Sequence, residues 1–122
     1  DGKIAAETFD NLIVTQGQGE IASGTLPLAY PNPFSPIKNN SVDFTYTLTA
    51  NGDVTFYLFD LNARLLLRKY LVSGTVGGSA GFNRVSWDGR TDLGEVIGAG
   101  GYILKLVSGG KVIGSIKLAV VY

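Results

Sequence analysis

One stretch of this sequence, WDGRTDLGE from Trp87 onward, gathers side chains that could do chemistry: three carboxylates and an arginine beside the only tryptophan. The carboxylates of Asp88, Asp92 and Glu95 could bind calcium, with the tryptophan as a stacking surface for a sugar. Calcium takes about six to eight oxygen ligands, and an EF-hand loop places them at alternating positions. Here the spacing is four and then three, and Arg90 lies inside the loop and competes for the same carboxylates.

The same stretch also has a purely structural interpretation. Aspartate side chains cap backbone amides and glycine accepts positive φ, so the Asp-Gly and Leu-Gly pairs in it are typical of turns. If Trp87 ends a strand, it points into the core together with Val85, because alternate residues of a strand share a face. We therefore favour a turn over a calcium or sugar site.

The composition excludes most chemistry elsewhere in the chain. Among its 122 residues there is no cysteine, histidine or methionine. Zinc, haem and iron–sulfur centres lose their usual ligands, and a Ser-His or Cys-His nucleophile is impossible. Only carboxylates remain as acids or bases, and most of them lie in expected turns. We expect no enzyme, no cofactor and no required metal.

The charge balance bears on possible partners. Ten basic and ten acidic residues give a formal net charge of zero, so there is no electrostatic reason to bind nucleic acid or an anionic membrane. The apolar runs fall short of the roughly 20 residues that a membrane helix needs. We expect no nucleic-acid partner and no membrane insertion.

From residue 42 onward the hydrophobic period is two, which predicts strands. Residues 42–48 alternate, Asn51-Gly52 is a strong hairpin signal, and 54–60 is a return strand, apolar on both faces and so central. A second turn follows, with Asn62 as its left-handed residue. Residues 64–72 suit helix or strand; we predict a strand, because a tight turn directs them back antiparallel.

Later segments complete the set. Strands are expected at 82–87, 102–107 and 111–121, with a flexible glycine-rich loop at 74–81. Three prolines in YPNPFSP make that segment extended and confine it to a sheet edge, with Phe34 filling the core. The prediction is an all-β, immunoglobulin-like antiparallel sandwich over residues 26–122. The predicted core is Phe44, Tyr46, Phe56, Leu58, Val85, Trp87, Leu104 and Leu106.

Residues 1–25 form an extended N-terminal arm in this interpretation. The arm is glycine-broken but holds one apolar segment with the candidate self-association residues Phe9, Leu12, Ile13 and Val14. An extended strand satisfies its backbone only on a sheet edge, of the same molecule or of a neighbour. A head-to-tail contact with a neighbour does not close and generates a fibre. Because the sequence begins at Asp1 without an initiator methionine, we expect a processed chain or a trimmed fragment.

Two motifs on these elements carry a family resemblance. YPNPFSP precedes the first core strand, and RVSWDGRTDLGEVIGAGGYILKL spans the late loop. Together they resemble the immunoglobulin-like domain of flagellar hook-capping proteins and the C-terminal sorting domains of type IX secretion substrates, over residues 28–121. Relatives often have glycine where this chain has Ala63, and proline and serine within VIGAGGY. The resemblance implies a structural, exporting or anchoring role and no catalytic residue.

Two functions from different classes follow. The first is a structural subunit of an extracellular or cell-surface assembly, a filament formed by strand addition of the arm, with copies of the same chain as partners. The second is a sorting or anchoring domain of a secreted protein, with secretion or cell-surface machinery as partner. A carbohydrate-binding module is a weaker alternative, because it needs an exposed aromatic row and the aromatic residues here are expected to alternate into the core.

Overall fold

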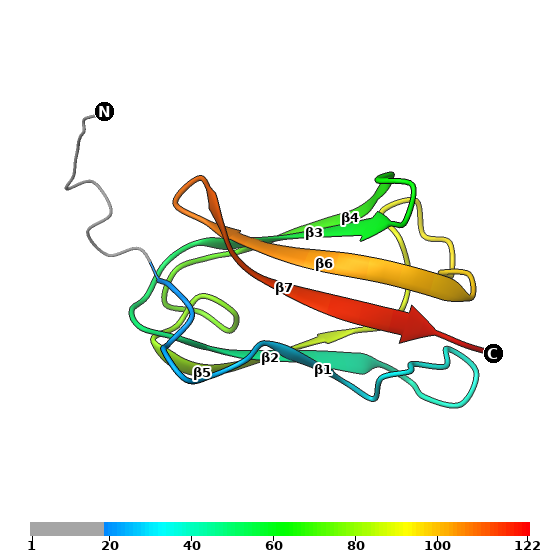
Figure 1. Ribbon diagram of the computed structural model, residues 1–122, viewed down its shortest axis with the longest axis horizontal. Coiled ribbons are helices and arrows are strands. Elements are labelled where there is room, and N and C mark those ends of the chain that lie inside the picture. The colour runs from blue at the N-terminus through cyan, green and yellow to red at the C-terminus, as the bar shows by residue number, and fades with distance from the viewer. Residues whose placement is uncertain (1–18) are drawn as a thin grey trace.

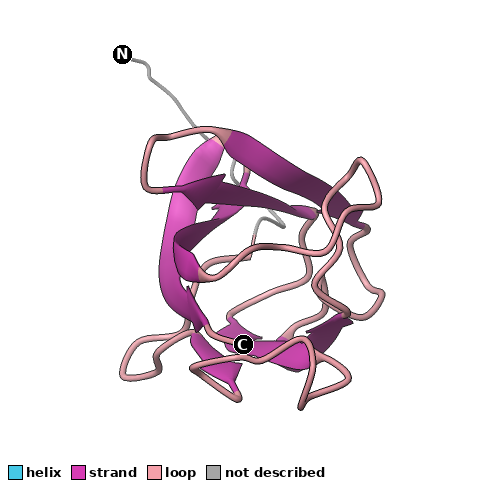
Figure 2. Ribbon diagram, turned by 90° about the vertical axis from the view of Figure 1, so that its right-hand side faces the viewer, coloured by secondary structure: helices cyan, strands magenta, loops and turns pink. Residues whose placement is uncertain are grey.

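The computed structural model describes residues 19–122, which form two antiparallel sheets packed face to face (Figures 1 and 2). The smaller sheet has the order β1-β2-β5, from β1 (Leu28–Tyr30), β2 (Val42–Leu48) and β5 (Gly81–Trp87). The larger sheet has the order β4-β3-β6-β7, from β4 (Leu65–Leu71), β3 (Val54–Asp60), β6 (Gly100–Ser108) and β7 (Lys111–Val120). Residues 19–122 contain no helix, so the predicted β-sandwich is confirmed, including the strand at the ambiguous 64–72.

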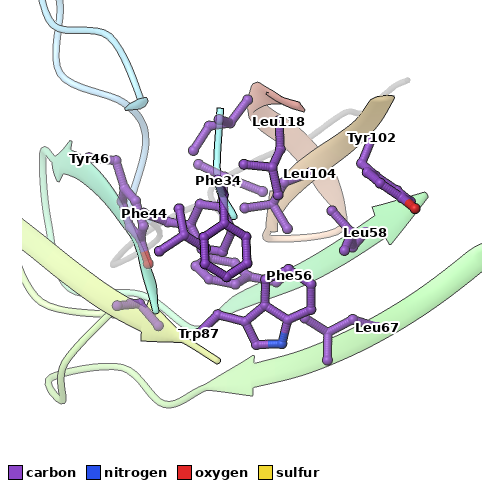
Figure 3. Packing of buried hydrophobic residues seen from close by; sticks show 14 of the residues in the cluster. Phe34, Phe44, Tyr46, Phe56, Leu58, Leu67, Trp87, Tyr102, Leu104 and Leu118 are labelled. Carbon is purple, nitrogen blue, oxygen red and sulfur yellow. The ribbon is translucent and has the colours of Figure 1, made fainter. Parts of the chain in front are cut away.

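The core lies between the sheets because alternate residues of each strand are apolar and point inward. All eight predicted core residues are buried. The ring of Phe44 meets Phe56 edge to face at 5.7 Å between centroids and stacks on Trp87 at 6.2 Å. Figure 3 shows these side chains gathered with Phe34, which is also fully buried.

The hairpin predicted at Asn51-Gly52 is wrong. Strands β2 and β3 belong to different sheets, β2 pairs with β1 and β5, and β3 pairs with β4 and β6. Asn51 and Gly52 instead carry the chain across the sandwich, where the Gly52 amide donates to the carbonyl of Gly78 at 3.1 Å. Gly52 does not have a positive φ, so the backbone lacks the geometry of a two-residue hairpin turn. Consecutive strands pair at β1–β2, β3–β4 and β6–β7, but β2 and β3 do not pair, contrary to the expected hairpin.

The turn between β3 and β4 also differs from expectation. The left-handed residue is Ala63, with φ of 64°, and not Asn62. The Asp60 side chain sets this register, because its Oδ1 accepts from the amides of Asn62 and Arg64 at 2.9 Å each. The Arg64 amide is the main reason that the pKa of Asp60 lies below its usual range.

The proline-rich segment runs along the edge of β7, as predicted. The Phe34 amide donates to the Ala119 carbonyl at 2.8 Å, and the Val121 amide donates to the Phe34 carbonyl at 3.0 Å. The side chain of Asn32 bridges the same edge, accepting from the Ala119 amide at 3.0 Å and donating to the Lys117 carbonyl at 2.8 Å. This segment therefore blocks the second half of that edge against strand addition.

The first described residues pair with β2 before β1 begins. The Ala22 amide donates to the Thr47 carbonyl, and the Thr49 amide donates to the Glu20 carbonyl, each at 2.9 Å. Glu20 also forms an ion pair with Lys111 at 3.1 Å, at the start of β7. The chain thus joins the sandwich at the end that carries the β6–β7 hairpin (Figure 1).

Candidate functional site

The WDGRTDLGE stretch is a turn held by its own polar groups. Asp88 accepts the amide of Arg90 through Oδ1 at 3.0 Å, and the Trp87 indole donates to the Arg90 carbonyl at 2.8 Å. The Arg90 guanidinium donates to the carbonyl of Gly94 at 3.0 Å rather than to a carboxylate. The polar groups of this turn therefore mainly satisfy its own backbone.

Asp92 has a separate role at the edge of β4. Its amide donates to the carbonyl of Leu66 and its Oδ2 accepts from the amide of Arg68, both at 3.0 Å. These two hydrogen bonds occupy part of the β4 edge. Within residues 19–122 there is no group of three or more histidine, cysteine, aspartate or glutamate side chains that could hold a metal ion. Asp88 and Asp92 thus accept from backbone amides, as the turn interpretation predicts.

The glycine-rich loop at 74–81 is anchored and not free, contrary to expectation. The buried side chain of Asn83 accepts from the amides of Gly77 and Ser79 and donates to the Ser79 carbonyl at 2.8 Å. The hydroxyl of Tyr46 donates to the Gly77 carbonyl at 2.7 Å. Burial raises the pKa of that hydroxyl well above its usual value.

A different surface combines hollows, apolar side chains and cations: the outer face of the larger sheet next to the β3–β4 turn. Leu61 stands there with 74% of its surface exposed. It separates two hollows of about 540 Å³ and 280 Å³, and both also share Ile103. We call this surface the Leu61 groove. Its remaining lining residues are Asn32, Phe59, Asp60, Ala63, Gly101, Tyr102, Lys105, Lys117, Leu118 and Ala119.

The floor of the Leu61 groove follows from strand register. Ile103 lies opposite Phe59 on one side and Lys117 on the other. Gly101, the next outward position on β6, leaves room for Leu61, whose Cδ1 would lie 3.4 Å from a Cβ built on that glycine. Outward-facing apolar residues of two central strands thus meet an exposed leucine.

Positive charge surrounds this apolar surface. Lys105 and Lys117 line its two hollows, and Arg68 lies one strand further, opposite Tyr57. Among the described residues, none of these three cations takes part in a salt bridge. The nearby Asp60 is engaged by Arg64 at 3.2 Å. The groove can therefore accept an apolar segment that carries negative charge.

This surface was missed in the sequence. The apolar residues on both faces of 54–60 were attributed to the strand's central position alone. The half-buried Phe59, whose ring stacks on that of Tyr57 at 6.5 Å, belongs to the outer face. An outward-facing aromatic pair flanked by exposed Leu61 was the available signal.

The expectation that aromatic residues alternate into the core holds only in part. Tyr30, Tyr70 and Phe82 are largely exposed. Tyr30 and Phe82 lie on the outer face of the smaller sheet and Tyr70 on that of the larger, because each alternates with inward-facing neighbours. Tyr70 shares its face with the stacked, outward-facing pair of Tyr57 and Phe59.

The predicted self-association residues Phe9, Leu12, Ile13 and Val14 lie outside the described residues. The described part contains no helix that could cross a membrane. Neither a protein-family model nor a curated protein matches the chain.

Solved structures with the same fold include two proteins of Porphyromonas gingivalis. PorZ, an essential bacterial surface component of the type IX secretion system, is similar with a TM-score of 0.53 and 22% identity over 79% of this chain. Dimeric latent PorU is similar with a TM-score of 0.64 and 17% identity over 93% of this chain. The chain spans only 11% of PorZ and 10% of PorU, so each likeness concerns one part of a much larger protein.

The same fold occurs in a protein of unrelated chemistry. The alkylpurine DNA glycosylase AlkC of Pseudomonas fluorescens, bound to DNA containing an abasic site analogue, is similar with a TM-score of 0.56 and 14% identity. That likeness covers 85% of this chain and 30% of AlkC. At these identities the comparisons establish the fold and no activity.

Proposed function

We propose that this chain is a non-enzymatic sorting or anchoring domain of a protein exported to the bacterial cell surface by a type IX secretion system. The observation that carries the proposal is the combination of motif and fold. The YPNPFSP and WDGRTDLGE motifs resemble those of type IX sorting domains, and PorZ of that system contains a sandwich of the same fold. The secretion machinery is the partner in this role.

The structure supports a role in binding other proteins through the domain surface. The side chains of Asp88 and Asp92 in the most polar loop accept from backbone amides, and the buried polar side chain of Asn83 is hydrogen-bonded within the fold. What remains available is the exposed surface, including the Leu61 groove. Such a surface suits recognition by other proteins.

Export can be tested with a reporter. The 122-residue chain is fused to the C-terminus of a reporter that carries a signal peptide, and expressed in Porphyromonas gingivalis and in a strain lacking PorZ. We expect protease-accessible reporter on the surface of the first strain only. The matched control carries the part of AlkC that shares the fold, and it should stay inside. Retention of the first fusion, or equal export of the AlkC fusion, would refute the proposal.

A second role is that of a subunit in a self-assembling cell-surface filament. It is favoured by the positions of the start of the described chain and of the Leu61 groove on the sandwich. The described chain begins at the end with the β6–β7 hairpin, whereas the Leu61 groove lies at the end with the β3–β4 turn (Figure 1). Donor and acceptor at opposite ends suit a head-to-tail contact, which propagates without closing. Sedimentation and electron microscopy of the full chain test this role, and a chain that stays monomeric at millimolar concentration would contradict it.

A further inference from the structure

We propose that the Leu61 groove is the acceptor for residues 7–16 of a second copy of this chain. The inference rests on the self-assembling role and not on export. It differs from the edge-strand docking expected from the sequence, and residues of the same chain cover the second half of the β7 edge and part of the β4 edge.

Chemical complementarity supports this occupant. Residues 7–16 read ETFDNLIVTQ, with four large apolar side chains and two acidic residues, Glu7 and Asp10. The groove offers exposed apolar surface on Leu61 and half-buried surface on Ile103, between Lys105 and Lys117. An apolar segment with negative charge buries its side chains there and places its carboxylates near ammonium groups that form no salt bridge within the described residues.

Reach limits which part of residues 7–16 could enter the groove of the same molecule. Gly101 of the groove and Ser108 at the β6–β7 hairpin are seven residues apart on one strand, about 24 Å at 3.4 Å per residue. The described chain starts beside that hairpin, where Glu20 pairs with Lys111. A fully extended chain covers at most about 3.6 Å per residue, so Ile13 and Val14, six and five residues before Gly19, extend no further than about 22 Å and about 18 Å, and within one molecule only residues 7–12 could reach the Gly101 end of the groove. A neighbouring molecule has no such restriction.

The first test measures association of the full 122-residue chain by sedimentation velocity over a concentration series. Leu61→Glu should raise the concentration of half-association at least about tenfold, since it removes a buried leucine and adds a charge that repels Asp10. Leu93→Glu is the matched control, because Leu93 is also a largely exposed loop leucine but lines neither hollow of the groove, and it should behave as the wild type.

A charge exchange tests the identity of the occupant. Lys117→Glu should weaken association, and adding Asp10→Lys in the same chain should restore it. Weakening without restoration would overturn residues 7–16 as the occupant and leave an acidic partner of another kind.

Disulfide capture tests which molecule donates the segment. The chain has no native cysteine, so Leu12→Cys and Leu61→Cys single variants can be mixed and oxidised. We expect a covalent heterodimer, and none from Leu12→Cys mixed with Leu93→Cys. A double variant with Leu12→Cys and Leu61→Cys that forms only an internal disulfide would overturn docking between copies.

The outcomes separate this inference from the roles above. A wild-type chain that stays monomeric defeats both self-assembly and this acceptor surface, while the export proposal stands. If Leu61→Glu leaves association unchanged, only the proposed acceptor surface is refuted.

Discussion

Truncation of Phe34 should reveal how strongly the proline-rich segment holds the sandwich together. Phe34 is fully buried and lies in a segment that is joined to β7 by backbone hydrogen bonds on both sides of it. Phenylalanine-to-alanine changes in cores cost about 3–5 kcal/mol, through lost transfer energy and the cavity left behind. A domain of this size has a free energy of unfolding of about 5–15 kcal/mol, so Phe34→Ala should remove a large part of it.

Gly89 provides a second measurement of the same contact. Its φ is +85°, and a Cβ built there would lie 3.1 Å from the Phe34 ring. Gly89→Ala should therefore cost about 1–2 kcal/mol from the left-handed backbone and an additional amount from the ring. In the Phe34→Ala background the ring is gone, so only the backbone part should remain, and the two substitutions should be non-additive.

The assay is urea unfolding followed by the fluorescence of Trp87, which stacks within the same core. Ile37→Ala is the control, because Ile37 is exposed in the same segment and should change stability by less than about 0.5 kcal/mol. A loss below about 1 kcal/mol for Phe34→Ala would refute the reasoning. An equal cost of Gly89→Ala in both backgrounds would show that the ring contact has no energetic weight.

Three further predictions concern turns and titrating groups. Ala63→Gly should stabilise the domain by about 0.5–1 kcal/mol in urea unfolding, because glycine relieves the left-handed φ of 64° at some cost in unfolded-state entropy. Burial raises the pKa of Tyr46, so the folded state favours the neutral phenol. The free energy of unfolding should therefore fall as pH rises above about 10. Tyr46→Phe should reduce that fall. Hydrogen bonds from the Ser73 amide and then from the Tyr70 hydroxyl lower the pKa of Asp53. The stabilising contribution of Asp53 is therefore present above about pH 4 and disappears as pH falls through the folded-state pKa. Asp53→Asn should reduce the fall of the urea unfolding midpoint at acid pH.

Strand positions were predictable because a local period of two reports burial directly. The alternation in 42–48 placed Phe44 and Tyr46 in the core without any knowledge of partners. Pairing was not predictable in the same way, because Asn51-Gly52 has the residues of a hairpin turn whether or not the next strand stays in the same sheet. Sheet membership depends on which strands bury each other's apolar faces, and that involves the whole chain.

The left-handed position shows a similar limit. Asparagine tolerates positive φ better than alanine, so propensity pointed to Asn62. The two amides bound by Asp60 fix the turn one residue later. The side chain of Asp60, before the turn, thus overrides the preference of Asn62 for positive φ. The Leu61 groove was missed for a related reason, since its parts come from β3, the turn, β6 and β7 and meet only in the folded chain.

The occurrence of this sandwich in PorZ and in a DNA glycosylase means that its core carries no functional information. The differences must lie in what each sequence places on its outer surfaces. In this chain the conspicuous polar loop, with Asp88 and Asp92, is engaged in hydrogen bonds to backbone amides. By contrast, Lys105 and Lys117 line the two hollows beside Leu61 and have no salt-bridge partner among the described residues. Leu61 lies between two hollows beside the outward-facing Phe59 and Ile103, so the apolar area there is contiguous, as at protein-recognition surfaces. Either of the proposed partners, the export machinery or another copy of the chain, would account for the exposed leucine and for cations that have no salt-bridge partner among the described residues.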